Sequence, residues 1–222
     1  MKIGLLYKTE IAEHKEFVAN IAKQTSRELF TSDCIPDDAA GFCDELGIDI
    51  LFISCDNRRK EIQRYLNLCR DLRLPYVFLT DTMPHLRPLA GLLSPVTMFE
   101  EEVHKAEVLG HLNRFTGAQI TLLQANDYGS RAEQNTNKII TALNARGVQA
   151  EVLKARKDSF SVGRESAERG RKLSADMLVV TASRDYGLDD IFFGPQELHI
   201  IRHSNIPVML LNPRGDLYSL CD

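Results

Sequence analysis

The residues best suited to chemistry lie in a loop between two apolar runs near the end of the chain. Gly187 and Gly194 lie in this loop, which follows an apolar run at 177–181 and precedes a helix predicted over 196–202. Glycines let backbone N–H groups approach phosphate oxygens, and the N-terminus of the following helix adds donors and a favourable dipole. Together with a second apolar run at 208–211, this pattern predicts a strand, phosphate-type loop, helix and strand.

Three other groups in this region invite a chemical interpretation. Asp189 and Asp190 are adjacent carboxylates that could serve acid/base chemistry, although a solvated loop explains them better. His199 and His203 are four residues apart on the predicted helix and could share a metal, but no third ligand accompanies them, and an imidazole at a helix end contacts terminal carbonyls. Ser183 lacks the G-x-S-x-G setting of a nucleophile elbow. We therefore expect no metal and no catalytic residue.

Apolar strands and amphipathic helices alternate along the chain, which predicts a parallel α/β sheet. The strands are continuous Val, Ile and Leu runs, as expected where both faces of a parallel sheet are buried. The predicted strands are 2–7, 28–31, 50–54, 76–80, 92–97, 120–125, 150–154, 177–181 and 208–211. The predicted helices are 11–24, 36–46, 58–72, 100–115, 130–146, 161–173 and 196–202.

An internal repeat divides the chain. The segment 49–55 (DILFISC) resembles 176–182 (DMLVVTA), and 74–79 (LPYVFL) resembles 206–211 (IPVMLL). The spacings indicate that the first copy lacks the glycine loop and, upstream, about one helix and one strand. We therefore predict two unequal copies of one unit. The boundaries are 1–83 for the abbreviated domain, 84–90 for the linker, 91–213 for the complete domain and 214–222 for a C-terminal tail.

Composition excludes several function classes. The 222 residues are 44% hydrophobic and 26% charged, with a net charge of −4 and interleaved signs, so no basic stripe of the kind that nucleic acids require is evident. The apolar run at the N-terminus is too short for a signal peptide or a membrane span. The five cysteines show no CxxC spacing, which predicts free and mostly buried thiols. We expect a cytoplasmic chain without nucleic-acid or membrane partners.

The second copy resembles the universal stress protein family. The similarity runs from LLSPVTMFEEEVHKAEVLGHLNRFTGAQITLLQA, starting at Leu92, to IIRHSNIPVMLL, ending at Leu211, and extends more loosely to the first copy. The resemblance implies a Rossmann-like α/β sandwich in tandem form. Because members of this family commonly dimerise through their last strands, it also implies an internal pseudo-dimer with 76–80 and 208–211 edge to edge. A further homodimer stays open.

One branch of this family binds ATP through an Asp after the first strand and a G-x-x-G, nine residues, G-[S/T] loop. In this sequence the Asp position falls on Thr97, and the first two glycines fall on Thr181 and Arg184. Gly194 remains, but Pro195 replaces the hydroxyl residue and lacks a backbone N–H. The resemblance therefore implies a non-enzymatic stress-response protein that acts through protein association and uses no cofactor.

A nucleotide-binding module, for ATP or AMP, is the alternative. Such a module would use the crevice at the carboxyl ends of the strands, where open α/β sheets bind ligands. A hydrolase would depend on Asp189 and Asp190 alone. The candidate nucleotide-binding residues are Thr97, Gln124, Thr181, Arg184, Gly187 and Gly194.

Overall fold

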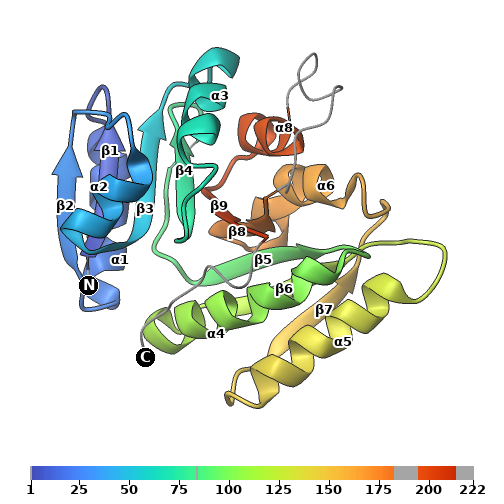
Figure 1. Cartoon of the computed structure of the whole chain (residues 1–222). Helices are drawn as coiled ribbons and strands as arrows, with labels where there is room; N and C mark the ends of the chain where they lie inside the picture. Colours follow the sequence, from blue (N-terminus) through green and yellow to red (C-terminus); the bar gives the residue numbers. More distant parts are fainter. Residues whose placement is uncertain (1, 84, 183–194, 214–222) are drawn as a thin grey trace.

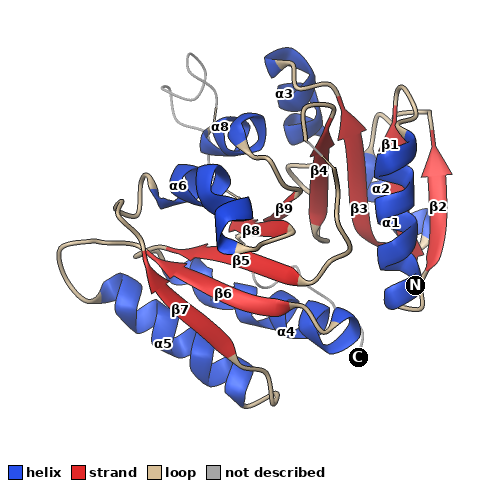
Figure 2. Cartoon of the chain, turned by 180° about the vertical axis from the view of Figure 1, so that it is seen from behind, coloured by secondary structure: helices blue, strands red, loops and turns tan. Residues whose placement is uncertain are grey.

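A single nine-stranded sheet forms the centre of the molecule (Figures 1 and 2). The computed structural model describes residues 2–83, 85–182 and 195–213. The strand order is β2-β1-β3-β4-β9-β8-β5-β6-β7. The strands are β1 (Lys2–Tyr7), β2 (Glu28–Ser32), β3 (Ile48–Cys55), β4 (Tyr76–Thr80), β5 (Gly91–Val96), β6 (Gln119–Gln124), β7 (Ala150–Lys154), β8 (Met177–Thr181) and β9 (Val208–Leu211).

Helices cover both faces of the sheet and create two apolar layers. One layer contains buried residues of α2, α3, α6 and α8, and the other contains mainly those of α1, α4 and α5. The helices are α1 (Ala12–Gln24), α2 (Ala39–Leu46), α3 (Arg59–Leu68), α4 (Lys105–Thr116), α5 (Arg131–Asn144), α6 (Val162–Arg169) and α8 (Gln196–His203). Two 3-10 turns, η1 (Glu100–His104) and η2 (Gly170–Leu173), adjoin α4 and α6. No helix in the described ranges combines the length and apolarity needed to cross a membrane.

The apolar strand runs are explained by this arrangement. In β3, Leu51 and Ile53 point into one apolar layer, whereas Ile50 and Phe52 point into the other. Successive side chains of a strand face opposite sides, so a strand covered on both sides needs apolar residues at every position. The expected α/β sheet, parallel within each half and buried on both faces at its central strands, is confirmed.

The two parts of the chain meet through one antiparallel pair, β4 with β9. Val77 lies opposite Met209, and every other strand pairing in the sheet is parallel. The predicted edge-to-edge contact of 76–80 with 208–211 is therefore present. Outward from it, the first half (residues 2–83) places β4, β3, β1 and β2, and the second half (residues 91–213) places β9, β8, β5, β6 and β7. Only β7 extends the second series beyond the first.

Most predicted elements have the expected position, with differences at helix ends. The segment predicted as a helix from Glu100 begins as the 3-10 turn η1, and the helix predicted to end at Leu72 ends at Leu68. The helix predicted from Pro36 begins at Ala39, because the Asp38 carboxylate caps it by accepting from the backbone N–H groups of residues 40 and 41. Gly47 ends this helix in the left-handed region, φ 66°, as expected for a glycine C-cap.

An aspartate at the start of β8 anchors the chain entering β5. Asp176 is 7% exposed and its Oδ2 accepts from the backbone N–H groups of Ala90 and Gly91, each at 3.0 Å. Its Oδ1 lies 2.9 Å from the Arg87 guanidinium. A side chain at Gly91 would place its Cβ 2.4 Å from the Ser174 carbonyl oxygen, so only glycine allows this close approach.

Asp49 has the corresponding place in the first half, and its partner reaches into the second half. The Arg27 Nε donates to Asp49 Oδ2 at 2.6 Å, and a terminal nitrogen of Arg27 lies 3.0 Å from His111 Nε2 in α4. The guanidinium also lies over the Phe115 ring. Burial first, and then the Arg27 charge, lower the pKa of His111. A single buried arginine therefore joins β3 to α4.

The predicted linker, 84–90, is held by contacts with both halves. Leu86 N–H donates to Glu13 in α1 at 2.7 Å, and Arg171 donates to the His85 carbonyl at 2.8 Å. Leu89 is buried at 2% exposure. Described residues of this segment form no helix or strand, as expected, but their contacts fix its path between the halves.

A buried histidine fills the carboxyl edge of the first half. The His14 Nδ1 lies 2.7 Å from Ser54 Oγ at the end of β3, and the ring also hydrogen-bonds the backbone of Thr80 at the end of β4. Burial lowers the pKa of His14, and the charge of Glu13 and the bond to Thr80 oppose this only in part. Helix α1 is therefore joined to two strand ends by a ring that is most stable when neutral.

We expect Asp176→Ala to lower the free energy of unfolding by about 2–4 kcal/mol, because two backbone donors in a largely buried setting lose their acceptor. Asp176→Asn keeps an acceptor and should cost less, since its lost ion pair involves a half-exposed arginine. Urea denaturation of both variants tests this expectation. The exposed Asp37→Ala serves as the control. Equal losses in Asp176→Asn and Asp176→Ala would contradict the role given to the backbone donors.

We expect the protein to lose stability as the pH falls below about 6.5, because the unfolded chain then binds a proton that the buried His14 ring resists. The lowered pKa in the folded state sets this sign: the stabilisation is complete above the unfolded pKa and decreases toward acid. Urea denaturation at several pH values measures how the free energy of unfolding depends on pH. This dependence should be weaker for His14→Gln than for wild type. Exposed His104→Gln is the matched control and should keep the wild-type slope.

Candidate functional site

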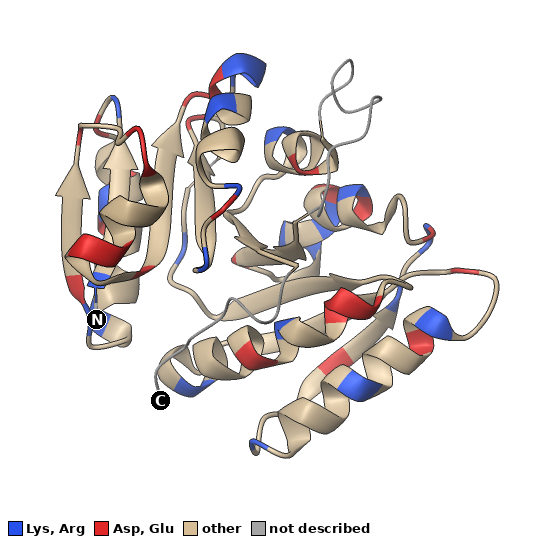
Figure 3. Ribbon diagram, in the orientation of Figure 1, with Lys and Arg blue, Asp and Glu red and all other residues tan. Residues whose placement is uncertain are grey.

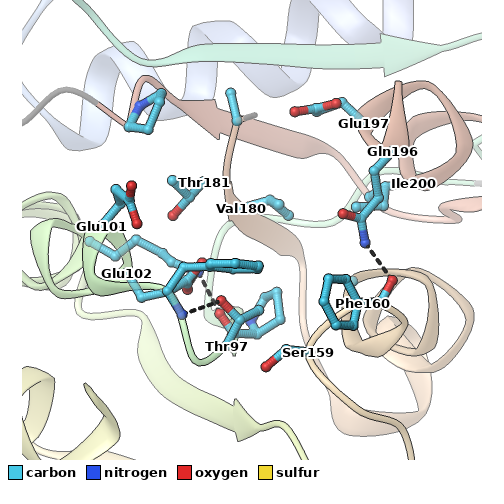
Figure 4. Close-up of a pocket in the computed structure, with 16 residues that line it drawn as sticks. Thr97, Glu101, Glu102, Ser159, Phe160, Val180, Thr181, Gln196, Glu197 and Ile200 are labelled. Atoms are coloured by element: carbon cyan, nitrogen blue, oxygen red, sulfur yellow. Dashed lines mark hydrogen bonds and ion pairs between the residues drawn. The ribbon is translucent and has the colours of Figure 1, made fainter. Parts of the chain in front are cut away.

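A cavity lies at the carboxyl ends of β5 and β8, between η1 and the start of α8 (Figure 4). Its volume is about 430 Å³, within the usual range for small-molecule sites. We call it the strand-end pocket. Its described lining residues are Pro95, Thr97, Phe99, Glu101, Glu102, Lys105, Ser159, Phe160, Gly163, Val180, Thr181, Ala182, Gln196, Glu197, Ile200 and Pro213.

The candidate nucleotide-binding residues are only partly brought together. Thr97 and Thr181 line the strand-end pocket, and the buried Thr181 Oγ1 has no hydrogen-bond partner among the described residues. Gln124 ends β6 and is not part of the lining. The remaining candidates, Arg184, Gly187 and Gly194, lie outside the described residues, as do Ser183, Asp189 and Asp190.

A buried ion pair forms one wall of the strand-end pocket. Lys105 is 1% exposed, and its ammonium group contacts the Glu102 carboxylate and donates to the Pro95 carbonyl at the end of β5. Burial lowers the pKa of Lys105, and the charge and hydrogen bond of Glu102 oppose this. The Lys105 ammonium group is therefore already bound by Glu102 and by a backbone carbonyl. The i,i+3 spacing of Glu102 and Lys105 is the signal in the sequence that could have indicated this pair.

The described lining is acidic. Glu101 and Glu102 reach the pocket from η1, and Glu197 reaches it from α8 with 2% exposure, whereas Lys105 is the single described cation in the lining. Pro195, the residue that precedes α8, has no backbone N–H that could donate to a phosphate group. Like charge disfavours phosphate in such a setting. The described walls therefore suit an uncharged or cationic group better than a triphosphate.

Two exposed aromatic rings stand at the strand-end pocket. Phe99 is 46% exposed and Phe160 is 66% exposed, and their centroids are 6.0 Å apart in an edge-to-face arrangement. Gln196 Nε2 donates to the Phe160 carbonyl at 2.9 Å, which fixes the loop that carries this ring (Figure 4). Exposed aromatic area beside a cavity is suited to contact with a flat or apolar ligand group.

Polar contacts hold the loops around the strand-end pocket. Ser159 Oγ donates to the Asp127 carboxylate after β6 and accepts from the Met98 N–H at 2.8 Å, so this hydroxyl is not placed to act as a nucleophile. The Asn135 amide in α5 donates to the carbonyls of Thr97 and Phe99, at 3.0 and 2.8 Å. These bonds link the ends of β5 and β6 to the loop before α6.

The other candidate groups have structural contacts. His203 Nδ1 lies 2.8 Å from the His199 carbonyl, in agreement with the expected role of an imidazole at a helix end. Within the described ranges, no group of His, Cys, Asp and Glu side chains could hold a metal ion. Cys43, Cys55 and Cys69 are free and buried, as predicted, whereas Cys34 is exposed. Burial raises the pKa of Cys43 to about 12.

We expect Lys105→Met to lower the free energy of unfolding by about 3–5 kcal/mol, because it leaves the buried Glu102 carboxylate without its counter-charge. The double variant Lys105→Met with Glu102→Met should lose much less, since no buried charge remains. Chemical denaturation of the single and double variants measures the coupling. The exposed pair Lys15–Glu10 provides the matched control, in which Lys15→Met should leave stability unchanged. Additive losses at Glu102 and Lys105 would contradict the coupling.

Comparison with known proteins identifies the fold. Neither a protein-family model nor a curated protein matches the chain. Among solved structures, a universal stress protein from Archaeoglobus fulgidus DSM 4304 is similar with a TM-score of 0.62 and 11% identity, over 96% of this chain and 86% of that one. A candidate universal stress protein from Pseudomonas aeruginosa UCBPP-PA14 is similar with a TM-score of 0.55 and 14% identity, over 97% and 84% of the two chains.

A functionally unknown protein from Pseudomonas aeruginosa PAO1 gives the same TM-score and identity, over 97% of this chain and 83% of that one. At identities this low, the similarity concerns architecture. The chain has the Rossmann-like α/β fold of universal stress proteins, across nearly its whole length.

Proposed function

We propose that the chain is a non-enzymatic stress-response protein of the universal stress type, made of two unequal copies that form an internal pseudo-dimer. It acts by association with other molecules and needs no bound ATP. The duplication is supported by the matching strand order on either side of β4 and β9, and by Asp49 and Asp176, which lie at the starts of the corresponding strands β3 and β8. The missing counterpart of β7 agrees with the shorter first copy.

The observation that carries the ligand part of this proposal is the chemistry of the strand-end pocket. Its described walls hold Glu101 and Glu197, and its lysine is already paired with Glu102. Thr97 occupies the position of the adenine-binding Asp in the ATP-binding branch, and Pro195 removes a phosphate donor. Each change weakens ATP binding by its own physical route, through lost hydrogen bonds and like charge.

The non-enzymatic part is supported by the state of the described nucleophile and base candidates. Ser159 bonds Asp127 and Met98, and Ser54 and His14 contact each other inside the first half. Catalytic groups must reach a reacting atom, and these side chains are used to join loops and strands.

Nucleotide binding is the second candidate function, favoured by one observation. Phe99 and Phe160 place two exposed rings beside a pocket at the carboxyl end of a parallel sheet, where a base could stack. In this alternative, AMP fits better than ATP, because fewer phosphates meet the acidic walls.

Thermal unfolding with ATP, ADP or AMP and Mg²⁺ tests the choice. We expect no concentration-dependent rise in Tm with any of the three. A ligand present at a thousandfold excess over its Kd would stabilise the fold by about 4 kcal/mol, which is easily measured. A clear rise would overturn the proposal in favour of nucleotide binding.

If a nucleotide raises the Tm, the variant Phe99→Ala tests whether the nucleotide binds in the strand-end pocket. Loss of the effect in Phe99→Ala, with retention in the exposed-aromatic control Tyr128→Ala, would assign the nucleotide to the strand-end pocket.

A further inference from the structure

A basic groove lies between α6 and α8, next to the strand-end pocket. Its cavity measures about 680 Å³ and shares Phe160, Gln196 and Ile200 with that pocket. Helix α6 approaches α8 closely because Gly163 has no side chain: an added Cβ would lie 2.7 Å from Ile200 Cδ1. We call this feature the α6/α8 groove.

Four cations line the α6/α8 groove without a partner of opposite charge among the residues that the structure describes. Arg156 and Lys157 come from the loop after β7, Arg164 from α6 and Lys172 from η2. All four are exposed, and none forms an ion pair with a residue in the described ranges. Figure 3 marks the charged positions on α6 and its neighbouring loop. Linear sequence did not reveal this cluster, because its members are separated by acidic residues.

The acidic residues beside these cations differ in availability. Glu165 is buried at 6% exposure and accepts from the backbone N–H groups of Arg156 and Lys157 and from the Arg169 guanidinium. Burial alone would raise the pKa of Glu165, but these hydrogen bonds outweigh it and lower the pKa. The Glu165 carboxylate is therefore fully engaged by these donors and does not neutralise the four exposed cations. Glu168 is the one exposed carboxylate in the described lining of the groove.

We propose that the α6/α8 groove binds an extended acidic segment of a partner protein. Arg164 and Glu168 are four residues apart in α6, about 6 Å along its axis, and Lys172 follows in the 3-10 turn η2. In an extended peptide, side chains on one face repeat every two residues, about 6.6 Å apart. Two carboxylates four residues apart on one face of such a peptide can therefore lie near Arg164 and Lys172, with an uncharged or basic side chain between them opposite Glu168.

Further residues of the α6/α8 groove also suit an acidic peptide. Beyond Arg164, the loop adds Arg156 and Lys157, which favours further acidic residues at that end of the peptide. Phe160, which is 66% exposed, offers apolar surface within the groove, which suits one aliphatic or aromatic side chain among the acids.

A compact polyphosphate fits this lining less well than a peptide. Phosphate groups of such a ligand are directly linked, so one of them would lie against Glu168 when others contact Arg164 and Lys172. A nucleic-acid backbone repeats one charge per phosphate and meets the same repulsion. The carboxylate within the row therefore favours a ligand whose charges can be interrupted.

This inference rests on the proposed function, since it gives the protein association a surface. Fluorescence anisotropy with a labelled short peptide that carries Glu at every fourth residue and Ser elsewhere provides the test. We expect binding that weakens with salt, and about a fivefold or greater loss of affinity in the double variant Arg164→Gln with Lys172→Gln. Glu168→Gln should tighten binding, because it removes the like charge.

The matched control is Arg131→Gln with Lys138→Gln on α5, which changes the net charge equally on the opposite face of the sheet. It should keep wild-type affinity. The proposal is overturned if the peptide does not bind, if the α5 control loses as much affinity as the groove variant, or if tripolyphosphate or single-stranded DNA binds this groove more tightly than the peptide.

Native mass spectrometry addresses a second copy of the chain as occupant. A dimer that is lost in the groove variant and kept in the α5 control would overturn the proposal, because the occupant would then be the chain itself. The outcome is independent of ATP binding: peptide affinity tests the groove, whereas the nucleotide-dependent Tm tests the strand-end pocket.

Discussion

The antiparallel pairing of β4 with β9 is the interaction on which the rest of the architecture depends. Each of these strands would otherwise expose a row of backbone N–H and C=O groups and an apolar surface on both faces. Their registered residues, such as Val77 opposite Met209, are all buried. The pairing makes one sheet from two, and it brings α3 beside α8, where Asn57 donates to the Arg202 carbonyl. The open edges move outward to β2 and β7, and β7 carries the exposed charges Glu151 and Lys154.

The carboxyl ends of the strands are arranged differently in the two halves. In the second half, the ends of β5 and β8 border a cavity. In the first half, the connection after β3 is short, and Asn57 bonds Asp81 and Thr82 across the strand ends. His14 and Ser54 fill the space beneath with a hydrogen bond. One half therefore retains a cavity that a ligand could enter, whereas the other contributes packing and a strand edge.

Charge is separated over a short distance around α8. The strand-end pocket has acidic described walls, whereas the α6/α8 groove carries four exposed cations, and the two share Phe160, Gln196 and Ile200. Opposite potentials on neighbouring surfaces favour different partners and suppress wrong ones. This separation is compatible with the chain's modest net charge of −4, because both signs are present in similar numbers.

The sequence by itself determined the order and type of the elements. Continuous apolar runs specify strands buried on both faces, and the repeated segments at 49–55 and 176–182 indicate the internal repeat, because these signals are local. The helix ends were less predictable, as at Asp38, since a capping hydrogen bond decides them. Thr97 and Pro195, at positions where the ATP-binding branch of the family that the sequence resembles has an Asp and a hydroxyl residue, could also be recognised from the sequence.

Only the tertiary structure decided which side chains share a site. Lys105 and Glu102 look like ordinary surface residues until burial forces them to pair at the end of β5. Arg156 and Lys172 are brought to one groove by the turn between β7 and α6 and by the close approach of α6 to α8 at Gly163. The physical reason is the separation of the interacting residues along the chain. Strand and helix signals act between neighbours in the sequence, whereas pockets and charge clusters depend on contacts between distant segments.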